Sequence, residues 1–140
     1  MEIEPIKLFV YGTLMPNGRN FAHIKKYIQT TQAASIDGIL LDLGAYPALL
    51  HGDGVVKGVL LEMDLAALAV TDRIEGYRPG SNSSLFVRKE VGVRLDDGRA
   101  VSAWAYVFGD AEGVRERRQL IVGHDGDGRA VYAWQGCRSA

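Results

Sequence analysis

The chain is 140 residues long, and 16 Lys and Arg residues against 17 Asp and Glu leave a formal net charge of −1. This length suits a single domain, and the balanced charge excludes the basic surface that binds nucleic acid or an anionic membrane. Apolar residues make up 47% of the chain but form no run long enough to span a bilayer, so we expect no membrane segment. The N-terminus lacks a signal pattern, and the single cysteine, Cys137, allows no internal disulfide. These features predict a soluble cytoplasmic protein with one domain over residues 1–140.

The first half of the chain predicts three strands and one helix. Ile6 to Tyr11 is an apolar run that ends at Gly12, which is typical of a buried strand. Over Asn17 to Ile28, apolar side chains recur with the spacing of an amphipathic helix. Ser35 to Leu43 and Val55 to Met63 predict two further strands, separated by a connection rich in glycine and proline.

The second half begins with a short helix and continues with a hairpin. Asp64 is the expected N-cap of the helix, and Gly76 stands where a glycine ends one. Leu85 to Leu95 and Ala100 to Phe108 predict two strands, because an Asp-Gly pair separates two alternating segments. Both faces of these strands are partly apolar, so we expect a sheet that is covered on both sides, as in a barrel.

The C-terminal tail, residues 109–140, contains a near-repeat. Residues 127–134 have almost the same sequence as residues 97–104, which predicts a second turn followed by a strand. Two copies are too few for a solenoid. We expect the charged residues 115–118 to form an exposed helical patch.

The usual signatures of metal, nucleotide and nucleophile sites are missing from the sequence. His23, His51 and His124 are scattered and have no partner at metal-ligand spacing. The glycine-rich segments lack the spacing of a phosphate or dinucleotide loop, and no motif surrounds Cys137. We therefore expect neither a metal ion nor another cofactor.

The predicted helix carries two carboxylates in unusual places. Glu75 follows Leu68 by seven residues, and Asp72 follows Leu65 by the same interval, so both continue the expected apolar stripe. If Glu75 is buried, desolvation raises its pKa toward the value of a general acid and base at neutral pH. The alternative is that the helix frays before Glu75 and the carboxylate faces solvent.

The exit of the first strand is the second candidate feature. The chain runs from an apolar strand into Tyr11-Gly12-Thr13-Leu14, with a helix expected shortly afterwards. Backbone N–H groups in such a loop are suited to binding a carboxylate or a developing oxyanion. An ordinary exit from strand to loop would have the same appearance.

Four short motifs, taken together and in this order, resemble the γ-glutamylcyclotransferase-like (AIG2-like) family. They are Tyr11-Gly12-Thr13-Leu14, Gly44-Ala45-Tyr46-Pro47-Ala48, the helix end Asp72-Arg73-Ile74-Glu75-Gly76-Tyr77, and Phe86-Val87-Arg88. The resemblance covers about residues 6–108 and leaves the tail outside.

The resemblance implies an α+β fold built on a small mixed β-barrel with flanking short helices. It also implies an enzyme that cyclises a small γ-glutamyl amine or peptide to 5-oxoproline and releases the amine, with no metal or cofactor. Glu75 would be the catalytic acid and base. The implied substrate-binding residues are Tyr11, Gly12, Thr13, Leu14 and Tyr46.

One residue departs from the family pattern, and other functions remain open. Phe86 stands where the family usually has tyrosine, and Tyr106 on the neighbouring predicted strand is a candidate to supply the missing hydroxyl. Asp72 is expected in a helix-end or ion-pair role, and Arg88 either in an ion pair or holding an anionic group. The alternatives to an enzyme are a small-ligand binding module without turnover and an interaction scaffold.

Overall fold

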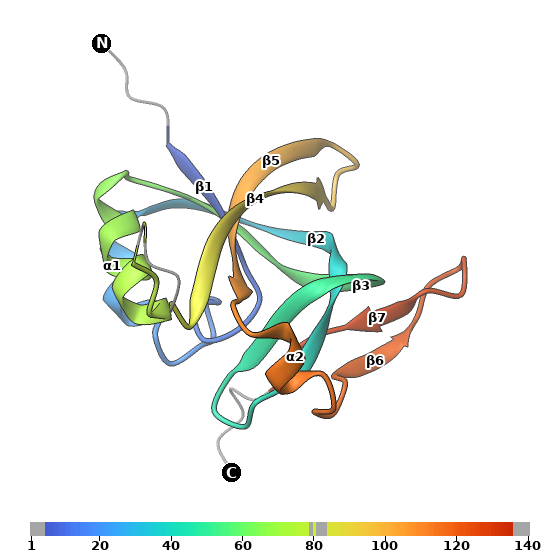
Figure 1. The fold of residues 1–140 in the computed structure, drawn as a ribbon. Coiled ribbons are helices and arrows are strands. Elements are labelled where there is room, and N and C mark those ends of the chain that lie inside the picture. Colours follow the sequence, from blue (N-terminus) through green and yellow to red (C-terminus); the bar gives the residue numbers. More distant parts are fainter. Residues whose placement is uncertain (1–4, 79, 81–83, 136–140) are drawn as a thin grey trace.

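Five strands close into a mixed barrel in the computed structural model, which describes residues 5–78, 80 and 84–135 (Figure 1). The strands are β1 (Ile6–Val10), β2 (Ile28–Asp42), β3 (Pro47–Met63), β4 (Phe86–Leu95) and β5 (Ala100–Phe108). Strand β1 pairs antiparallel with β3 and parallel with β5, and this double pairing closes the ring β1-β5-β4-β2-β3. The expected mixed barrel is confirmed. Cys137 and Met1 to Glu4, on which two of the sequence arguments rest, lie outside the described residues.

Short helices and a C-terminal hairpin surround the barrel. Helix α1 (Ala66–Glu75) lies on one side of it, and the hairpin of β6 (Ile121–His124) and β7 (Ala130–Tyr132) lies on the opposite side (Figure 1). The hairpin joins the sheet through a parallel pairing of β7 with β3, so the turn and strand expected in the tail are present. Two 3₁₀ helices precede β2, and α2 (Ala111–Val114) follows β5.

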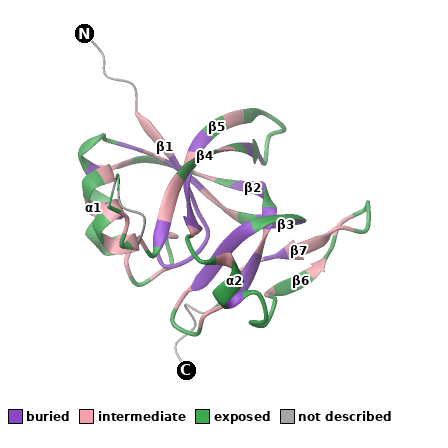
Figure 2. Cartoon of the chain, in the orientation of Figure 1, coloured by how far each residue is buried: buried purple, intermediate pink, exposed green. Residues whose placement is uncertain are grey.

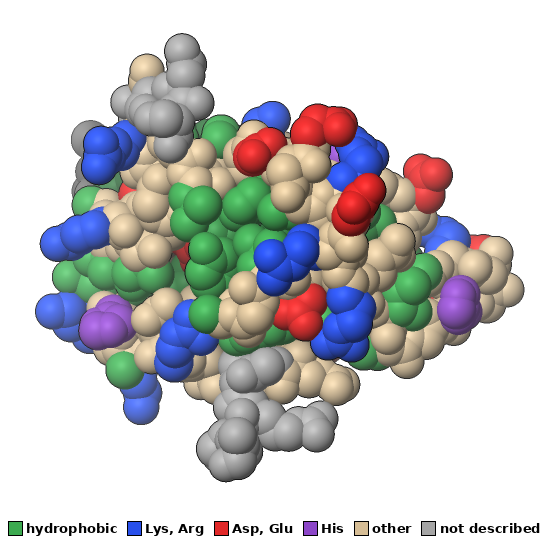
Figure 3. Space-filling view, turned by 60° about the horizontal axis from the view of Figure 1, so that its bottom comes forward, with side chains coloured by type: hydrophobic (Ala, Val, Ile, Leu, Met, Phe, Trp, Pro, Cys, Tyr) green, Lys and Arg blue, Asp and Glu red, His purple; other side chains and the backbone are tan. Residues whose placement is uncertain are grey.

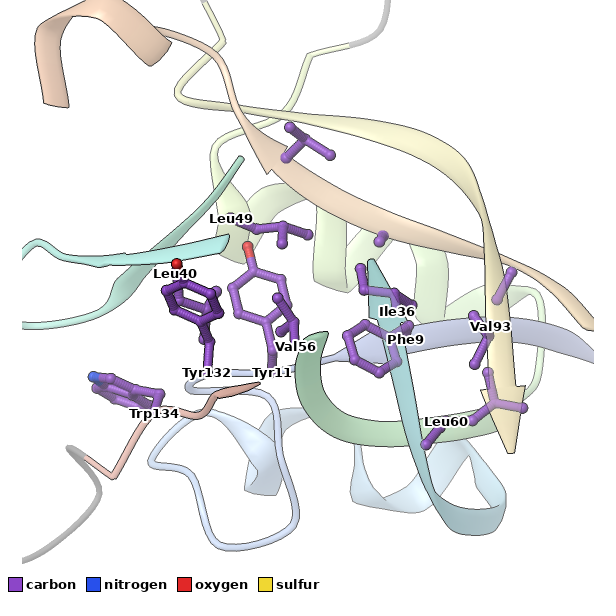
Figure 4. Close-up of a cluster of buried hydrophobic side chains, with 14 of the residues drawn as sticks. Phe9, Tyr11, Ile36, Leu40, Leu49, Val56, Leu60, Val93, Tyr132 and Trp134 are labelled. Carbon is purple, nitrogen blue, oxygen red and sulfur yellow. The ribbon is translucent and has the colours of Figure 1, made fainter. Parts of the chain in front are cut away.

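Strand β1 is buried on both of its faces. Phe9, together with Tyr11 just beyond the strand, projects into the barrel interior, where Figure 4 shows them among side chains of the facing strands. Leu8 and Val10 point the other way, into a second apolar cluster. Successive side chains of a strand point to opposite faces, so one five-residue strand contributes to both clusters.

The second cluster lies between the barrel and the elements that cover it. Ala67 and Thr71 of α1, Ile24 of the 3₁₀ segment, and Phe86 and Tyr106 of the sheet are all buried. Figure 2 shows the contrast between the buried inner side of these elements and the exposed outer side of α1. Burying an apolar side chain as large as Ile24 or Phe86 contributes about 1.5–3 kcal/mol, so this cluster holds α1 against the sheet.

The helix expected over residues 17–28 is absent. The segment instead forms two short 3₁₀ helices, η1 (Phe21–His23) and η2 (Lys25–Tyr27). Both ends of the segment are fixed, because Asn20 is hydrogen-bonded to Thr13 and Ile28 pairs with Met63 of β3. The few residues between these two points form single 3₁₀ turns, which are common in connections of this length.

Strands β2 and β3 are longer than the sequence predicted. They begin at Ile28 and Pro47 instead of Ser35 and Val55, and they pair along nearly their whole length. The expected glycine-rich connection is only a tight turn between Asp42 and Pro47, because the residues that follow Pro47 pair with β2 and belong to β3. Pairing with a neighbour therefore overrode the local turn signals.

The start of α1 also differs from expectation. Leu65 takes the N-cap position, and the Asp64 carboxylate instead accepts a hydrogen bond of 2.7 Å from Gln29. Leu65 is 57% exposed, so the prediction that it faces the core is wrong. The charged tail residues 115–118 are exposed as expected, but they form turns after α2 and not a helix.

Candidate active site

The loop that leaves β1 is buried and held from two sides. Tyr11, Thr13 and Leu14 are each at most 6% exposed. The backbone N–H of Asn20 donates to the Thr13 carbonyl at 2.9 Å, and the Asn20 side-chain amide donates to the Thr13 hydroxyl at 2.9 Å. No described residue accepts a hydrogen bond from the backbone N–H groups of residues 12–14. The loop is therefore a rigid element with amide donors available to a ligand.

Gly18 permits the loop to fold back on itself. A Cβ atom at this position would lie 2.2 Å from the Thr13 carbonyl oxygen, so any larger residue would push the two segments apart. The sequence analysis missed this role, although a glycine six residues after a site glycine is visible in the sequence.

Glu75 stands at the last position of α1, and the helix does not fray before it. The next residue, Gly76, adopts a left-handed conformation with φ of +70°. The Gly76 and Tyr77 N–H groups donate to the carbonyls of Arg73 and Asp72, which satisfies the end of the helix. This capping fixes the backbone at Glu75, and the side chain is half-buried.

The Glu75 carboxyl group has an unusual acidity. Burial disfavours its charged form and raises its pKa from 4.5 to about 7, while the positive charge of Arg19 acts in the opposite direction. Burial also raises the pKa of the neighbouring Tyr11 hydroxyl, and the charge of Glu75 adds to that effect. Near neutral pH, Glu75 can therefore both accept and donate a proton.

One pocket brings together all six residues that the resemblance implied. Glu75, Tyr11, Gly12, Thr13, Leu14 and Tyr46 all line it, and its volume is about 300 Å³ including the open mouth. The pocket is also lined by residues that the sequence analysis did not assign to the site, namely Phe9, Val10 and Pro47, and by Phe86 and Tyr106. It opens where β1 leaves the barrel, next to the C-terminal end of α1. On the face drawn in Figure 3, hydrophobic side chains gather in the middle and charged ones lie mostly around them.

Asp72 and Arg88 form an ion pair beside the pocket. Arg88 Nε lies 3.0 Å from Asp72 Oδ1, and each side chain is 15% exposed. The Arg88 guanidinium also lies over the rings of Trp104 and Tyr77, 4.6 Å and 5.4 Å from their centroids. Of the two roles considered for Arg88, the structure supports the ion pair.

Phe86 and Tyr106 lie on neighbouring strands at the pocket wall. Phe86 is buried and packs edge-on against Tyr46 and Phe108, with ring centroids 5.8 Å and 5.2 Å apart. The Tyr106 hydroxyl donates to Asp72 Oδ1 at 2.6 Å, and burial followed by the Asp72 contact raises its pKa. Its backbone carbonyl accepts a 2.5 Å hydrogen bond from the Tyr11 hydroxyl. Tyr106 therefore links α1 to the loop after β1.

In the described part of the chain, no group of three or more His, Cys, Asp or Glu side chains is arranged to hold a metal ion. Among the same residues, no helix combines the length and the apolar character needed to cross a bilayer.

Comparison with known proteins gives a consistent result. The family model described as "Gamma-glutamyl cyclotransferase, AIG2-like" matches residues 8–127, and so extends past Phe108 into the C-terminal hairpin. The chain is 37% identical over 103 residues to the γ-L-glutamyl-butirosin B γ-glutamyl cyclotransferase of Niallia circulans, covering 72% of this chain and 65% of that protein. It is 32% identical over 104 residues to the γ-glutamylcyclotransferase family protein YtfP of Escherichia coli K12, covering 74% and 82%.

Solved structures share the fold. An AIG2-like protein of Mus musculus superposes with a TM-score of 0.68 at 20% identity, covering 84% of this chain and 86% of that one. A protein of Arabidopsis thaliana superposes with a TM-score of 0.61 at 20% identity, covering 96% and 80%. With the barrel, the pocket and the sequence matches in agreement, this chain belongs to the γ-glutamyl cyclotransferase, AIG2-like family.

Proposed function

We propose that this protein is a γ-glutamylcyclotransferase that converts a γ-glutamyl amine or peptide into 5-oxoproline and a free amine, with Glu75 as general acid and base. The observation that carries the proposal is the position of Glu75. A carboxyl group with a pKa of about 7 lines the same pocket as a loop whose N–H groups have no described acceptor. Family membership supports an enzyme of this class.

The reaction closes a five-membered ring within one small molecule. The α-amino group of the substrate attacks its own γ-carbonyl carbon, the carbonyl oxygen becomes an oxyanion, and the bond to the departing amine then breaks. Two protons leave the α-nitrogen overall and two join the departing amine. A carboxyl group that accepts a proton and returns it is therefore not consumed.

Positioning is the largest gain available to the protein. Nucleophile and electrophile already belong to one molecule, and well-oriented intramolecular reactions reach effective molarities of about 10⁵ M or more. The pocket walls, including Tyr11 and Tyr46, would hold the substrate folded while the amides of residues 12–14 face its negative charge. The proposed chemistry needs neither a metal ion nor a cofactor. It can be classed as an intramolecular acyl transfer or as a lyase reaction, because the acyl group moves to a nitrogen of the same molecule and an amine is released without water.

The departing amine is the open part of the substrate. The Niallia circulans relative is named as a γ-glutamyl cyclotransferase of γ-L-glutamyl-butirosin B, so γ-glutamyl derivatives of larger amines are candidate substrates for this chain. γ-Glutamyl amino acids and glutathione are the other candidates.

A second candidate function is a binding module that uses the same pocket without turnover. The observation in its favour is Phe86, which has no hydroxyl where the family usually has tyrosine and which packs against Tyr46 in the pocket wall. A module of this kind would be stabilised by γ-glutamyl compounds and would release no product.

The deciding experiment incubates the protein with a panel of γ-glutamyl amino acids, glutathione and γ-glutamyl derivatives of larger amines. We expect equal amounts of 5-oxoproline and free amine from at least one of them, and a loss of roughly 100-fold or more in Glu75→Gln. Glu112→Gln, at an exposed glutamate on α2, is the matched control and should keep full activity. Parent activity in Glu75→Gln would refute the role of Glu75, and thermal stabilisation without product would favour the binding module.

A further inference from the structure

Arg19 is a charged residue next to the site loop that the proposed reaction has not yet used, and its charge acts on Glu75. Its two neighbours in the chain are fixed against the site loop: Gly18 packs directly on the Thr13 backbone, and Asn20 donates two hydrogen bonds to Thr13. The position of residue 19 is therefore set by the same contacts that shape the site loop.

The Arg19 side chain connects the segment after the site loop with the turn between β2 and β3. It is exposed, and its Nη1 atom donates a 2.6 Å hydrogen bond to the carbonyl oxygen of Ala45. Ala45 belongs to the turn between β2 and β3 and immediately precedes Tyr46 and Pro47, which both line the pocket. The guanidinium thus spans the distance from the loop after β1 to the opposite turn.

Most of the hydrogen-bonding capacity of Arg19 remains available. A guanidinium has five N–H donors in a planar fork, and the bond to Ala45 uses one of them. No described carboxylate lies within ion-pair distance of Arg19, whereas Arg88, for comparison, is paired with Asp72. Its charge nevertheless reaches the pocket, because it counteracts the rise in the pKa of Glu75.

The chemistry of cyclisation requires two electropositive sites. In the forming ring, the attacking nitrogen lies between the α-carbon, which bears the α-carboxylate, and the former γ-carbonyl carbon, which bears the oxyanion. The protein must hold one anionic group on each side of that nitrogen, with the base between them. In this protein, the amides of residues 12–14 and the guanidinium of Arg19 are two such donors, and both are near Glu75.

The guanidinium of Arg19 is exposed and the amides of residues 12–14 are buried, and this difference indicates which anionic group each one binds. The α-carboxylate is charged in the free substrate, so burying it is costly, and a planar carboxylate matches the fork of an exposed arginine such as Arg19. The oxyanion exists only during the reaction and gains most from fixed dipoles in a buried site, such as the amides of residues 12–14. We propose that Arg19 binds the α-carboxylate of the γ-glutamyl substrate, which leaves the loop amides for the oxyanion; this inference rests on the proposed function.

The test compares two ligands that differ in one group. 5-Oxoproline retains the carboxylate, and its carboxamide analogue replaces that group with a neutral one. Binding of each is measured by calorimetry to the parent protein, Arg19→Gln, Arg19→Lys and the control Arg73→Gln, whose arginine is exposed on α1 and, unlike Arg19, is not among the charges that shift the pKa of Glu75. We expect Arg19→Gln to weaken 5-oxoproline binding by about tenfold or more and to change carboxamide binding by less than about twofold, since a charge-assisted bond is lost for one ligand alone. Arg19→Lys should give an intermediate loss, and Arg73→Gln no loss.

Three results would overturn the inference. If Arg19→Gln weakened the binding of both ligands equally, Arg19 would only stabilise the turn at Ala45 and would not contact the carboxylate. An equal loss in Arg73→Gln would indicate a general effect of surface charge, and unchanged 5-oxoproline binding in Arg19→Gln would exclude the contact. Kinetics separate this from the proposed function: if the parent releases 5-oxoproline and Arg19→Gln leaves KM unchanged, the inference alone fails, whereas a parent that releases none contradicts the cyclotransferase proposal itself.

Discussion

Arg88 Nε lies 3.0 Å from Asp72 Oδ1, in an ion pair that ties strand β4 to the helix that carries Glu75. Tyr106 of β5 donates to the same carboxylate oxygen at 2.6 Å, and its hydroxyl lies 2.7 Å from the buried Thr71 hydroxyl. The last turn of α1 is therefore fastened to two strands, three residues before the carboxyl group that performs the proposed chemistry.

Replacing Arg88 by Met should destabilise the fold by about 2 kcal/mol, because the mostly buried Asp72 carboxylate would lose its cation. Arg99→Met is the matched control: Arg99 also pairs with an aspartate, but both side chains are well exposed, at 66% and 44%, so its loss should cost less than about 1 kcal/mol. Urea unfolding of both variants checks the difference. Equal costs would mean that the Asp72 pair contributes no more than a surface contact.

Tyr106→Phe should lower both stability and activity. The change removes one hydroxyl that bonds Asp72 and Thr71, at a cost of about 1–3 kcal/mol, and it loosens the helix end that positions Glu75. Tyr132→Phe also removes a hydroxyl bond from a buried tyrosine, here to Gln119 in the C-terminal segment, and should leave kcat unchanged. Thermal unfolding and 5-oxoproline release are measured together. Equal kcat values for the two variants would argue against a positioning role for Tyr106.

The rate should depend on pH through Glu75. Only the carboxylate form can take a proton from the substrate, and the pKa of Glu75 is about 7. We therefore expect kcat/KM to fall about tenfold for each pH unit below 7. A pH–rate profile from pH 5 to 8 measures this decrease in kcat/KM, and the residual activity of Glu75→Gln should not show it. A decrease that begins only near pH 4 to 5 would instead indicate a solvated carboxylate.

Stability should show the opposite trend with pH. The pKa of Glu75 is about 7 in the folded chain against an ordinary value of 4.5, so between these values the folded state binds more protons than the unfolded one. The contribution of Glu75 to stability is therefore fully present below pH 4.5 and is lost as the pH rises through 7. Glu75→Gln should be more stable than the parent by about 1–3 kcal/mol at pH 8 and similar to it at pH 4.5. Denaturant unfolding at the two pH values tests this, and an identical difference at both would contradict it.

Local patterns were sufficient for much of the fold. The Asp-Gly turn before Arg99 predicted the β4–β5 hairpin, and Gly76 predicted the end of α1, because each depends on the backbone preference of one or two residues. Glu75 was identified by its spacing from Leu68, although Leu65, on the same predicted stripe, turned out to be exposed. Periodicity thus indicated roughly which face of the helix packs against the barrel, but not the exact rotation of the helix about its axis.

Contacts between distant segments were beyond the reach of the sequence. The 3₁₀ segment replaced a predicted helix because Asn20 and Ile28 are tied to other parts of the chain. Arg19 reaches Ala45, 26 positions away, and nothing in the local sequence around either residue indicates that contact. Both outcomes depend on where the closed barrel places its loops.

The double pairing of β1 has a consequence for the order of assembly. Of the five barrel strands β1 is synthesised first, yet its register with β5, where Leu8 pairs with Trp104, requires nearly a hundred further residues to be synthesised. The edge of β1 that pairs with β5 stays unpaired during that time, and sheets with such distant partners fold slowly. The pocket, which opens at the end of β1, is therefore completed only late in synthesis, because a chain that stops before β5 lacks Tyr106 of the pocket wall.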